Sequence, residues 1–216
     1  MDNVNENINV VERNRTTYMI LKRGIDIILA TVALILFSPF FIAIAIAIRL
    51  DSKGDIAFGH RRLGKDRKII KVYKFRTMVH NADEVFNNFT KEQKEEYYKT
   101  FKLENDPRIT KVGAFLRKTS LDELPQLLNI IKGDMSIVGP RPIVQKEVEK
   151  YGMYADKFFS VIPGLTGYWQ ANGRSDTSYD ERVQMDMYYI DNRSLVMDIK
   201  IVFQTIISVI KKEGAV

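Results

Sequence analysis

One long apolar run near the N-terminus dominates the hydrophobic pattern of this chain. From Gly24 to Ile48 it reads GIDIILATVALILFSPFFIAIAIAI, interrupted by Asp26, Thr31 and Ser38. About 20 apolar residues cross a bilayer as a helix, so the run is long enough for one span. Residues 1–20 are polar and predict a tail outside the membrane.

Two features favour a re-entrant hairpin over residues 21–50. Ser38-Pro39 lies near the middle of the run, where proline removes a backbone donor and clashes with the preceding turn. Both flanks are basic, with Lys22, Arg23, Arg49, Lys53, Arg61 and Arg62. Positive charge marks the cytoplasmic side of a membrane segment, and here it marks both ends. A kinked helix that spans the membrane is the alternative that these features leave open.

The C-terminal segment, residues 198–212 (DIKIVFQTIISVIKK), has the pattern of an amphipathic helix. Its apolar positions recur at helical spacing: Ile199, Val202, Phe203, Ile206, Ile207 and Ile210. A basic amphipathic helix can lie in the plane of a membrane interface, and it can equally pack on its own domain. The pattern alone leaves both arrangements open.

Residues 51–216 are predicted to form one compact cytosolic domain. Two short β-like stretches lie between Ala57 and Val79, around Gly64-Lys65-Asp66. Ser120 is a good N-cap for a helix over Leu121–Ile131, with Glu123 in the capping-box position. The predicted fold class is therefore α+β and mainly helical, with a membrane hairpin, a small β element and interfacial amphipathic helices.

The composition restricts the chemistry that the chain can perform. It has no cysteine and two histidines among 216 residues, which excludes thiol nucleophiles and cysteine- or histidine-rich metal centres. A metal ion here would be a hard cation held by carboxylate and phosphate oxygens, and Mg²⁺ is the usual choice. The net charge of +6 favours an anionic partner: nucleic acid, a phosphorylated substrate or an anionic membrane.

The adjacent carboxylates Asp122 and Glu123 are the strongest candidates for catalysis. An ionised aspartate is a competent nucleophile toward phosphorus, because an acyl-phosphate intermediate divides one difficult transfer into two easier ones. At the first turn of the predicted helix, the positive end of the helix dipole favours the ionised form of these carboxylates. Acidic residues are also common in such first turns for stability alone. Basic residues favour the catalytic interpretation, since phosphoryl transfer needs positioned cations. They are Lys74, Arg76, Arg117 and Arg141.

Three motifs in order make the chain resemble the small monotopic phosphoglycosyl transferases, the bacterial sugar transferases that act on polyprenyl phosphate. They are KFRTM (Lys74 to Met78), NDPRITKVGAFLRKTSLDELPQLLNIIKGDMSIVGPRP (Asn105 to Pro142) and PGLTGYWQANGR (Pro163 to Arg174). The resemblance runs from about Lys22 to the C-terminus. It implies that a sugar-1-phosphate passes from a UDP-sugar to undecaprenyl phosphate, at the start of capsule, exopolysaccharide or glycoconjugate synthesis.

The resemblance also implies roles for individual residues. Asp122 would be the nucleophile that forms a phosphosugar–enzyme intermediate and releases UMP, with Mg²⁺ near Asp122. Glu123 would orient the site or handle the acceptor's proton. Lys74, Arg117 and Arg141 match basic residues around the phosphates, and Ser38-Pro39 matches the break of a re-entrant helix.

The expected location is the cytoplasmic face of the bacterial cytoplasmic membrane. There the acceptor's phosphate lies at headgroup level and the flanking cations meet anionic lipids. Two rival classes are a non-catalytic basic membrane scaffold and a nucleic-acid binder. The scaffold does not explain an acidic pair between Arg117 and Arg141, and nucleic-acid binding leaves the apolar run unexplained. We therefore expect no nucleic-acid partner.

Overall fold

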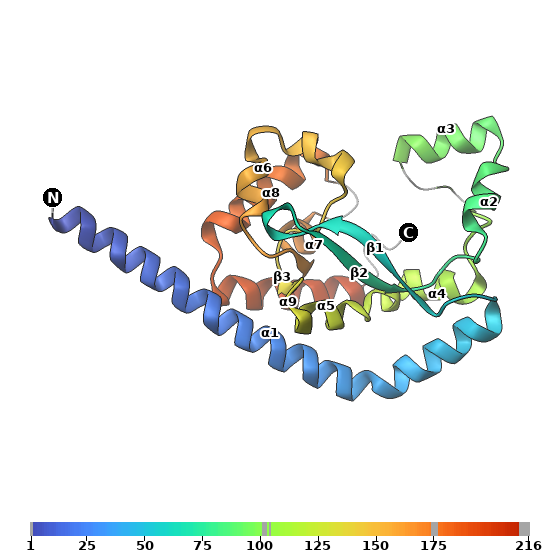
Figure 1. Ribbon diagram of the computed structural model, residues 1–216, viewed down its shortest axis with the longest axis horizontal. Coiled ribbons are helices and arrows are strands. Elements are labelled where there is room, and N and C mark those ends of the chain that lie inside the picture. Colours follow the sequence, from blue (N-terminus) through green and yellow to red (C-terminus); the bar gives the residue numbers. More distant parts are fainter. Residues whose placement is uncertain (1, 101–102, 104, 174–176, 212–216) are drawn as a thin grey trace. The chain divides into compact units, whose positions relative to one another are not determined.

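The structure is a computed structural model that describes residues 2–100, 103, 105–173 and 177–211. Arg174 of the third motif and Lys212 lie outside the described residues. The elements are, in order, α1 (Asp2–Asp51), β1 (Ala57–Leu63), η1 (Lys65–Arg67), β2 (Ile69–Phe75), α2 (Ala82–Asn87), α3 (Lys91–Thr100), α4 (Lys111–Thr119), η2 (Leu121–Glu123), α5 (Gln126–Lys132), β3 (Ser136–Val138), η3 (Gln145–Tyr154), α6 (Ala155–Phe159), β4 (Gly164–Thr166), α7 (Tyr168–Asn172), α8 (Tyr179–Asn192) and α9 (Leu195–Ile210). The described part of the chain is mainly helical with a small β content, as the sequence predicts (Figure 1).

The chain divides into two compact units. Described residues within Met1–Leu36, His60–Val72 and Gln126–Gly214 form unit 1. Those within Phe37–Gly59 and Tyr73–Pro125 form unit 2. The chain passes between the units inside α1, inside both strands of the β1–β2 sheet, and between Pro125 and Gln126.

Helix α1 is one continuous element from Asp2 to Asp51, with Pro39 inside it. The polar N-terminal segment, which was predicted to be a tail, is therefore helical from Asp2. Within Arg15–Asp51 an 18-residue window has a mean hydropathy of 2.7, and 11% of that window is buried. Among the described residues, this helix is long and apolar enough to cross a membrane. The boundary between the units falls just before Ser38-Pro39, and both of these side chains are exposed.

Unit 1 has its core between the β3–β4 sheet and the helices around it. The two strands are parallel, with Ser136 opposite Gly164 and Val138 opposite Thr166. Elements η3, α6 and α8 pack together, and α9 packs on α7 and the strands (Figure 1). The buried core residues are Leu63, Val138, Ile143, Tyr151, Ala155, Phe158, Phe159, Val183, Met187, Tyr189, Ile190 and Ile201.

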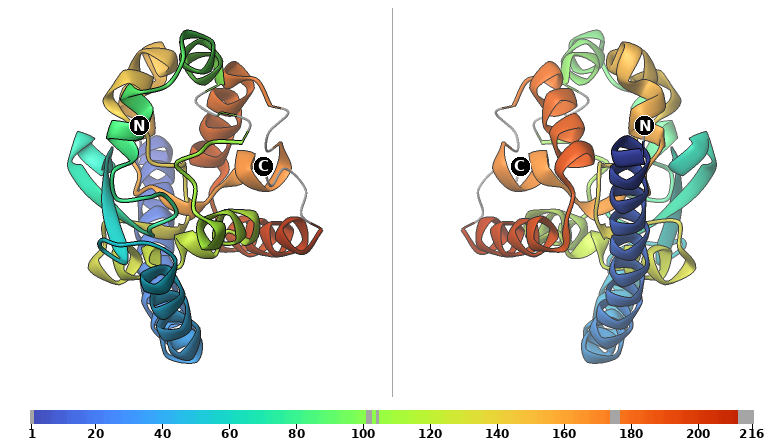
Figure 2. Two further views of the ribbon diagram at one scale, coloured as in Figure 1. Left: turned by 90° about the vertical axis from the view of Figure 1, so that its right-hand side faces the viewer. Right: turned by 90° about the vertical axis from the view of Figure 1, so that its left-hand side faces the viewer.

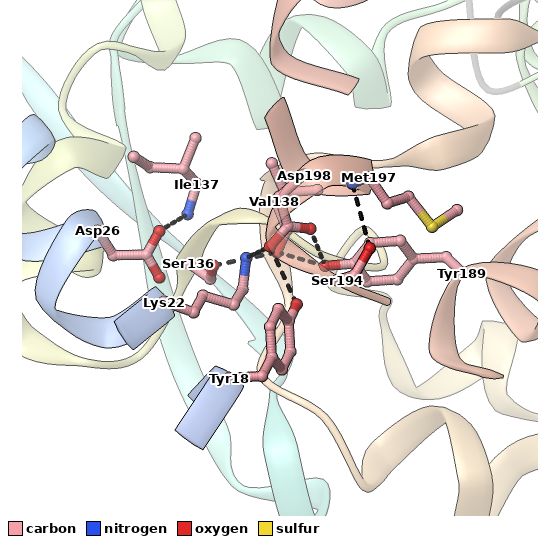
Figure 3. Close-up of polar contacts among 10 residues, drawn as sticks. All are labelled: Tyr18, Lys22, Asp26, Ser136, Ile137, Val138, Tyr189, Ser194, Met197 and Asp198. Carbon is pink, nitrogen blue, oxygen red and sulfur yellow. Dashed lines mark hydrogen bonds and ion pairs between the residues drawn. The ribbon is translucent and has the colours of Figure 1, made fainter. Parts of the chain in front are cut away.

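Asp198 connects α1 to the helices of unit 1. One of its oxygens, Oδ2, accepts hydrogen bonds from Lys22 Nζ at 2.7 Å and Tyr18 Oη at 3.0 Å. The other, Oδ1, accepts from Tyr189 Oη at 2.8 Å (Figure 3). One turn after Lys22, the buried Asp26 accepts a hydrogen bond from the Ile137 amide at 3.1 Å. Helix α9 meets α1 near Asp198 and extends away from it (Figure 2).

The C-terminal amphipathic helix predicted from the sequence is α9. Its buried side carries Ile201 and Ser208, and the Thr205 hydroxyl forms a hydrogen bond with that of Thr166. Its apolar face is exposed in this chain, and includes Val196, Ile199, Phe203, Ile206 and Ile207. The predicted Val202 is half-buried, and the side chain of Ile210 lies outside the described part.

In unit 2 the last turns of α1 pack on β2 and α4. The buried cluster is Ile48, Phe75 and Leu116, with Phe41, Ile44, Val112, Leu121 and Leu124 packed against it. The α1 terminus is also held by polar contacts. Asp51 Oδ2 accepts from the Val112 amide at 3.0 Å, and the Arg76 guanidinium donates to the Ser52 carbonyl at 2.7 Å and the Lys53 carbonyl at 2.8 Å.

The prediction of a single helix over Leu121–Ile131 capped by Ser120 is wrong. Ser120 has a left-handed backbone, with φ 56° and ψ 16°, and its side chain makes no cap hydrogen bond. A 3-10 turn covers Leu121–Glu123, and α5 begins only at Gln126. Pro125 explains the division, because proline has no amide to donate inside a helix but is well tolerated where one starts.

Candidate active site

Strand β2 and the turn after α4 bring the predicted acidic pair and one predicted cation together in unit 2. Lys74 Nζ lies 2.6 Å from Glu123 Oε1 and 3.5 Å from Asp122 Oδ2. These side chains are about 50 positions apart in sequence, yet they form one partly buried group. Asp122 is 9% exposed, so its carboxylate is largely buried and keeps a small exposure to solvent.

Burial raises the pKa of Asp122 above its ordinary value, the nearby charge of Lys74 opposes this rise, and Glu123 adds to it. This balance differs from the one predicted from sequence, in which an α-helix dipole favours the ionised carboxylate. The pair lies in a 3-10 turn of three residues, so the ammonium group of Lys74 supplies the compensating positive charge.

Arg117 lies on the last turn of α4, just before the acidic turn. Its Nε donates to Thr77 Oγ1 at 2.9 Å. Burial lowers the pKa of Arg117, while the charges of Asp122 and Asp106 raise it. The guanidinium is thus held beside Asp122 as a partly desolvated cation, which interacts more strongly with an anion than a solvated one does.

The remaining predicted residues have other positions. Arg141 is half-buried in unit 1, between the buried Pro140 and Pro142. The backbone on either side of this turn is fixed, because Gly139 N donates to Thr166 O and Gly164 N donates to Pro140 O, each at 2.9 Å. Arg76, a neighbouring cation in the sequence argument, donates to the Ser52 and Lys53 carbonyls at the end of α1.

Thr77 is a residue of this site that the sequence reasoning missed. It is 5% exposed and lies two positions after Phe75, which is 4% exposed. Alternate residues of an extended strand face the same side, so Thr77 shares the side of Phe75, whereas the earlier buried residues of β2, Ile70 and Val72, belong to the other alternation. The spacing of Thr77 from Phe75 was therefore the available signal.

The donor set of the acidic pair fits Mg²⁺. Proteins commonly bind Mg²⁺ through one or two carboxylates together with substrate phosphates, rather than through an all-protein cage. Asp122 and Glu123 offer that number of carboxylates. Within the described part of the chain no three His, Cys, Asp or Glu side chains form a metal-binding group, so phosphate oxygens would have to complete the coordination.

Comparison with known proteins gives the family of the chain. The bacterial sugar transferase family model matches residues 17–212. The chain belongs to this family. The match covers α1 from Thr17 onward and every residue of the candidate site. A bacterial sugar transferase is an enzyme, as the acidic pair and its cations predicted.

Several bacterial sugar transferases are closely similar to this chain. Exopolysaccharide production protein ExoY of Rhizobium meliloti is 49% identical over 197 residues, covering 90% of this chain and 87% of that protein. Undecaprenyl-phosphate galactose phosphotransferase of Salmonella typhimurium is 47% identical over 198 residues, covering 90% of this chain and 41% of that protein. UDP-glucose:undecaprenyl-phosphate glucose-1-phosphate transferase of Escherichia coli is 45% identical over 196 residues, covering 87% of this chain and 39% of that protein. The chain thus spans most of some relatives and less than half of others.

Proposed function

We propose that this sugar transferase moves a sugar-1-phosphate from a UDP-sugar to undecaprenyl phosphate and releases UMP. The reaction would begin the assembly of an exopolysaccharide, capsule or other glycoconjugate. The names of the relatives support this donor and acceptor. The observation that carries the proposal is the pairing of Asp122 and Glu123 with Lys74, next to Arg117.

In the proposed first step an Asp122 carboxylate oxygen attacks the phosphorus that carries the sugar. A bond forms between that oxygen and phosphorus, and the bond from phosphorus to the bridging oxygen breaks and releases UMP. Lys74 is close enough to favour the ionised nucleophile. Arg117 is available to stabilise negative charge on the phosphate oxygens. Glu123 holds Lys74 through its 2.6 Å contact.

In the second step a phosphate oxygen of undecaprenyl phosphate attacks the phosphorus attached to Asp122. The acyl-phosphate bond breaks and the carboxylate is regenerated. Asp122 and Glu123 would hold Mg²⁺, which when bound neutralises charge on the diphosphate. Arg141 is the remaining proposed phosphate contact, held in its turn by flanking prolines.

We propose that α1 is re-entrant, with both ends on the cytoplasmic side. From Arg15 to Asp51 it contains 37 residues, about 55 Å of helix, whereas the hydrocarbon core is about 30 Å thick. One end is fixed to unit 1 through Lys22 and Asp26, and the other to unit 2 through Ile48 and Asp51.

Connectivity supports the same topology. The chain runs between the units in both strands of a two-stranded sheet, and a sheet that is not closed into a barrel cannot cross hydrocarbon, because its edge amides would lack partners there. This supports the proposal that both ends of α1 lie on the same side of the membrane. Between those ends α1 exposes a continuous apolar surface: Ile27, Ile28, Leu29, Val32, Ile35, Leu36, Phe37 and Phe40.

The exposed apolar face of α9 supports an interfacial position for this helix, since a surface of this kind is costly in water. Lys22 and Arg23 serve the fold itself. Lys22 pairs with Asp198, and Arg23 donates to the carbonyls of Ile130 and Ile131. We propose that exposed cations such as Lys53 and Arg61 contact anionic lipids instead.

The deciding experiment measures UMP release from a panel of UDP-sugars with undecaprenyl phosphate and Mg²⁺. It compares the wild type with Asp122→Asn and, as a matched control, with Asp83→Asn, an exposed carboxylate of the same unit. We expect release with a particular sugar, lost in Asp122→Asn and kept in Asp83→Asn. Equal activity in Asp122→Asn would refute the nucleophile. A non-catalytic scaffold would release UMP from no donor.

Topology has a separate test, because the chain has no cysteine. Single cysteines at Thr16 and Lys53, both exposed, are labelled with an impermeant maleimide in sealed vesicles. Re-entry predicts that both react from the cytoplasmic side, with Ile35→Cys protected from either side. Labelling of the two positions from opposite sides would establish a spanning helix.

A further inference from the structure

Thr77 makes contacts with α4 at three points, through its backbone and its side chain. Its carbonyl accepts a hydrogen bond from the Thr110 amide at 3.1 Å, and its hydroxyl accepts one from Arg117 Nε at 2.9 Å. A Cβ added to Gly113 would lie 2.0 Å from the Thr77 carbonyl oxygen. The first turn of α4 therefore rests directly on the backbone of Thr77, and this close approach requires glycine.

The same face of α4 carries Gly113 and Arg117, since residues one turn apart in a helix point to the same side. The start of the helix is fixed independently, because Thr110 Oγ1 accepts from the Gly113 amide at 2.9 Å. Leu116, 1% exposed, holds the helix in the core of unit 2. The hydroxyl of Thr77 thus meets Arg117 from a rigid position.

This contact determines which part of the guanidinium is left for a ligand. Arginine carries N–H groups on Nε and on both Nη atoms, and two parallel N–H groups match a pair of phosphate oxygens. With Nε engaged by Thr77, the two Nη atoms form the fork that is available. A long, flexible side chain loses rotamer freedom when it is fixed, so a guanidinium already held in place binds phosphate at a lower entropic cost.

We propose that Thr77 is a positioning residue that orients Arg117 toward the phosphate oxygens of the nucleotide-sugar donor. Neighbouring charges fit this assignment, because the carboxylates of Asp106 and Asp122 both act on Arg117. Thr77 itself needs no contact with substrate. The proposal rests on the proposed function for its ligand, and on the Thr77–Arg117 geometry for its mechanism.

The test compares Thr77→Val, which keeps the shape and removes the hydroxyl, with Thr77→Ser, which keeps the hydroxyl. Losing a hydrogen bond to a charged group corresponds to a change of about ten- to one-hundred-fold in a rate or equilibrium constant. We expect Thr77→Val to lower kcat/KM for UMP release by about that factor, while thermal melting shows that the variant remains folded at the assay temperature. The kcat/KM of Thr77→Ser is expected to stay within about threefold of the wild-type value. Thr119→Val is the control, since that hydroxyl bonds the Phe115 carbonyl of its own helix.

A double-variant comparison separates positioning from a general packing effect. In an Arg117→Gln background, Thr77→Val is expected to cause no further loss of kcat/KM. A loss of the same size in both backgrounds would overturn the proposal, as would wild-type activity in Thr77→Val or equal losses in the Val and Ser variants.

A second readout makes the result independent of catalysis. In protein carrying ¹⁵N-arginine, the Nε–H signal of Arg117, assigned by its loss in Arg117→Lys, is expected to exchange slowly with solvent. Slow exchange should persist in Thr77→Ser and disappear in Thr77→Val. If the wild type released no UMP from any UDP-sugar, the proposed function would fail while this exchange measurement still decided the positioning role. Equal exchange in Thr77→Val and wild type would refute it.

Discussion

Replacing Asp198 with asparagine should destabilise unit 1 by weakening the attachment of α1 to α8 and α9. Asp198 accepts hydrogen bonds from three donors, on Tyr18, Lys22 and Tyr189 (Figure 3). The Lys22 and Asp198 side chains are 16% and 10% exposed. Asparagine removes the negative charge and turns one acceptor into a donor, so that it faces groups that also donate.

The expected size follows from this burial. Removing one member of a buried ion pair costs about 3–5 kcal/mol. Because this pair keeps some exposure and asparagine keeps one acceptor, we expect a loss of about 2–3 kcal/mol in the free energy of unfolding. For a chain of this length, that lowers the melting temperature by about 5–10 °C.

The assay is thermal unfolding of the detergent-solubilised protein, with Asp191→Asn as the matched control. Asp191 pairs with Lys157, but these side chains are 56% and 38% exposed, so the control should lose less than about 1 kcal/mol. A melting temperature of Asp198→Asn within about 1 °C of the wild type, or equal to that of Asp191→Asn, would show that the contact with α1 does not stabilise the fold.

Three further predictions test other parts of the structure. Gly113→Ala should lower the melting temperature sharply, because its Cβ would lie 2.0 Å from the Thr77 carbonyl oxygen. Gly24→Ala is the control and should leave the melting temperature unchanged, because a Cβ there would have nothing within 4 Å. Equal melting temperatures of the two variants would count against this packing. Burial raises the pKa of Asp186 to about 7 from 3.8, so the folded state retains a proton that the unfolded state has lost between these values. The free energy of unfolding should therefore fall by about 4 kcal/mol as pH rises through that window and then level off. In Asp186→Asn this decline should be absent from melting curves, and an unchanged pH profile would contradict the assignment. In vesicles, a spin label on Phe203→Cys should be more accessible to oxygen than to a nickel chelate, and a spin label on Lys200→Cys should be more accessible to the nickel chelate than to oxygen. The same accessibility at both positions would argue against an interfacial α9.

The sequence suggested the residue types of the candidate site but not their local conformation. Asp122, Glu123, Lys74 and Arg117 were all predicted, because nucleophiles and cations for phosphoryl transfer are a small set of side chains. The single helix expected over Leu121–Ile131, which includes Asp122 and Glu123, was wrong, since the N-cap pattern at Ser120 is overridden by its left-handed backbone and by Pro125. The same change replaces a helix dipole by the charge of Lys74 as the group that acts on Asp122.

The hydrophobic pattern likewise located α9, by the spacing of its apolar side chains, and the long apolar helix, by the length of its apolar run. Periodicity does not say which apolar face a domain covers. Only the tertiary structure left Ile199 and Phe203 of α9 exposed while burying Ile201. It also brought the Arg76 guanidinium into contact with the Ser52 carbonyl at the end of α1, and the Thr77 hydroxyl into contact with Arg117 Nε.

What the sequence by itself determined is therefore chemical: the absence of thiols, the apolar run, the acidic pair and the motifs that identify a bacterial sugar transferase. What only the tertiary structure decided is which of these groups meet. Lys74 reaches Glu123 across 49 positions and Lys22 reaches Asp198 across 176. Contacts at such separation depend on the packing of whole elements, for which local sequence patterns carry no signal.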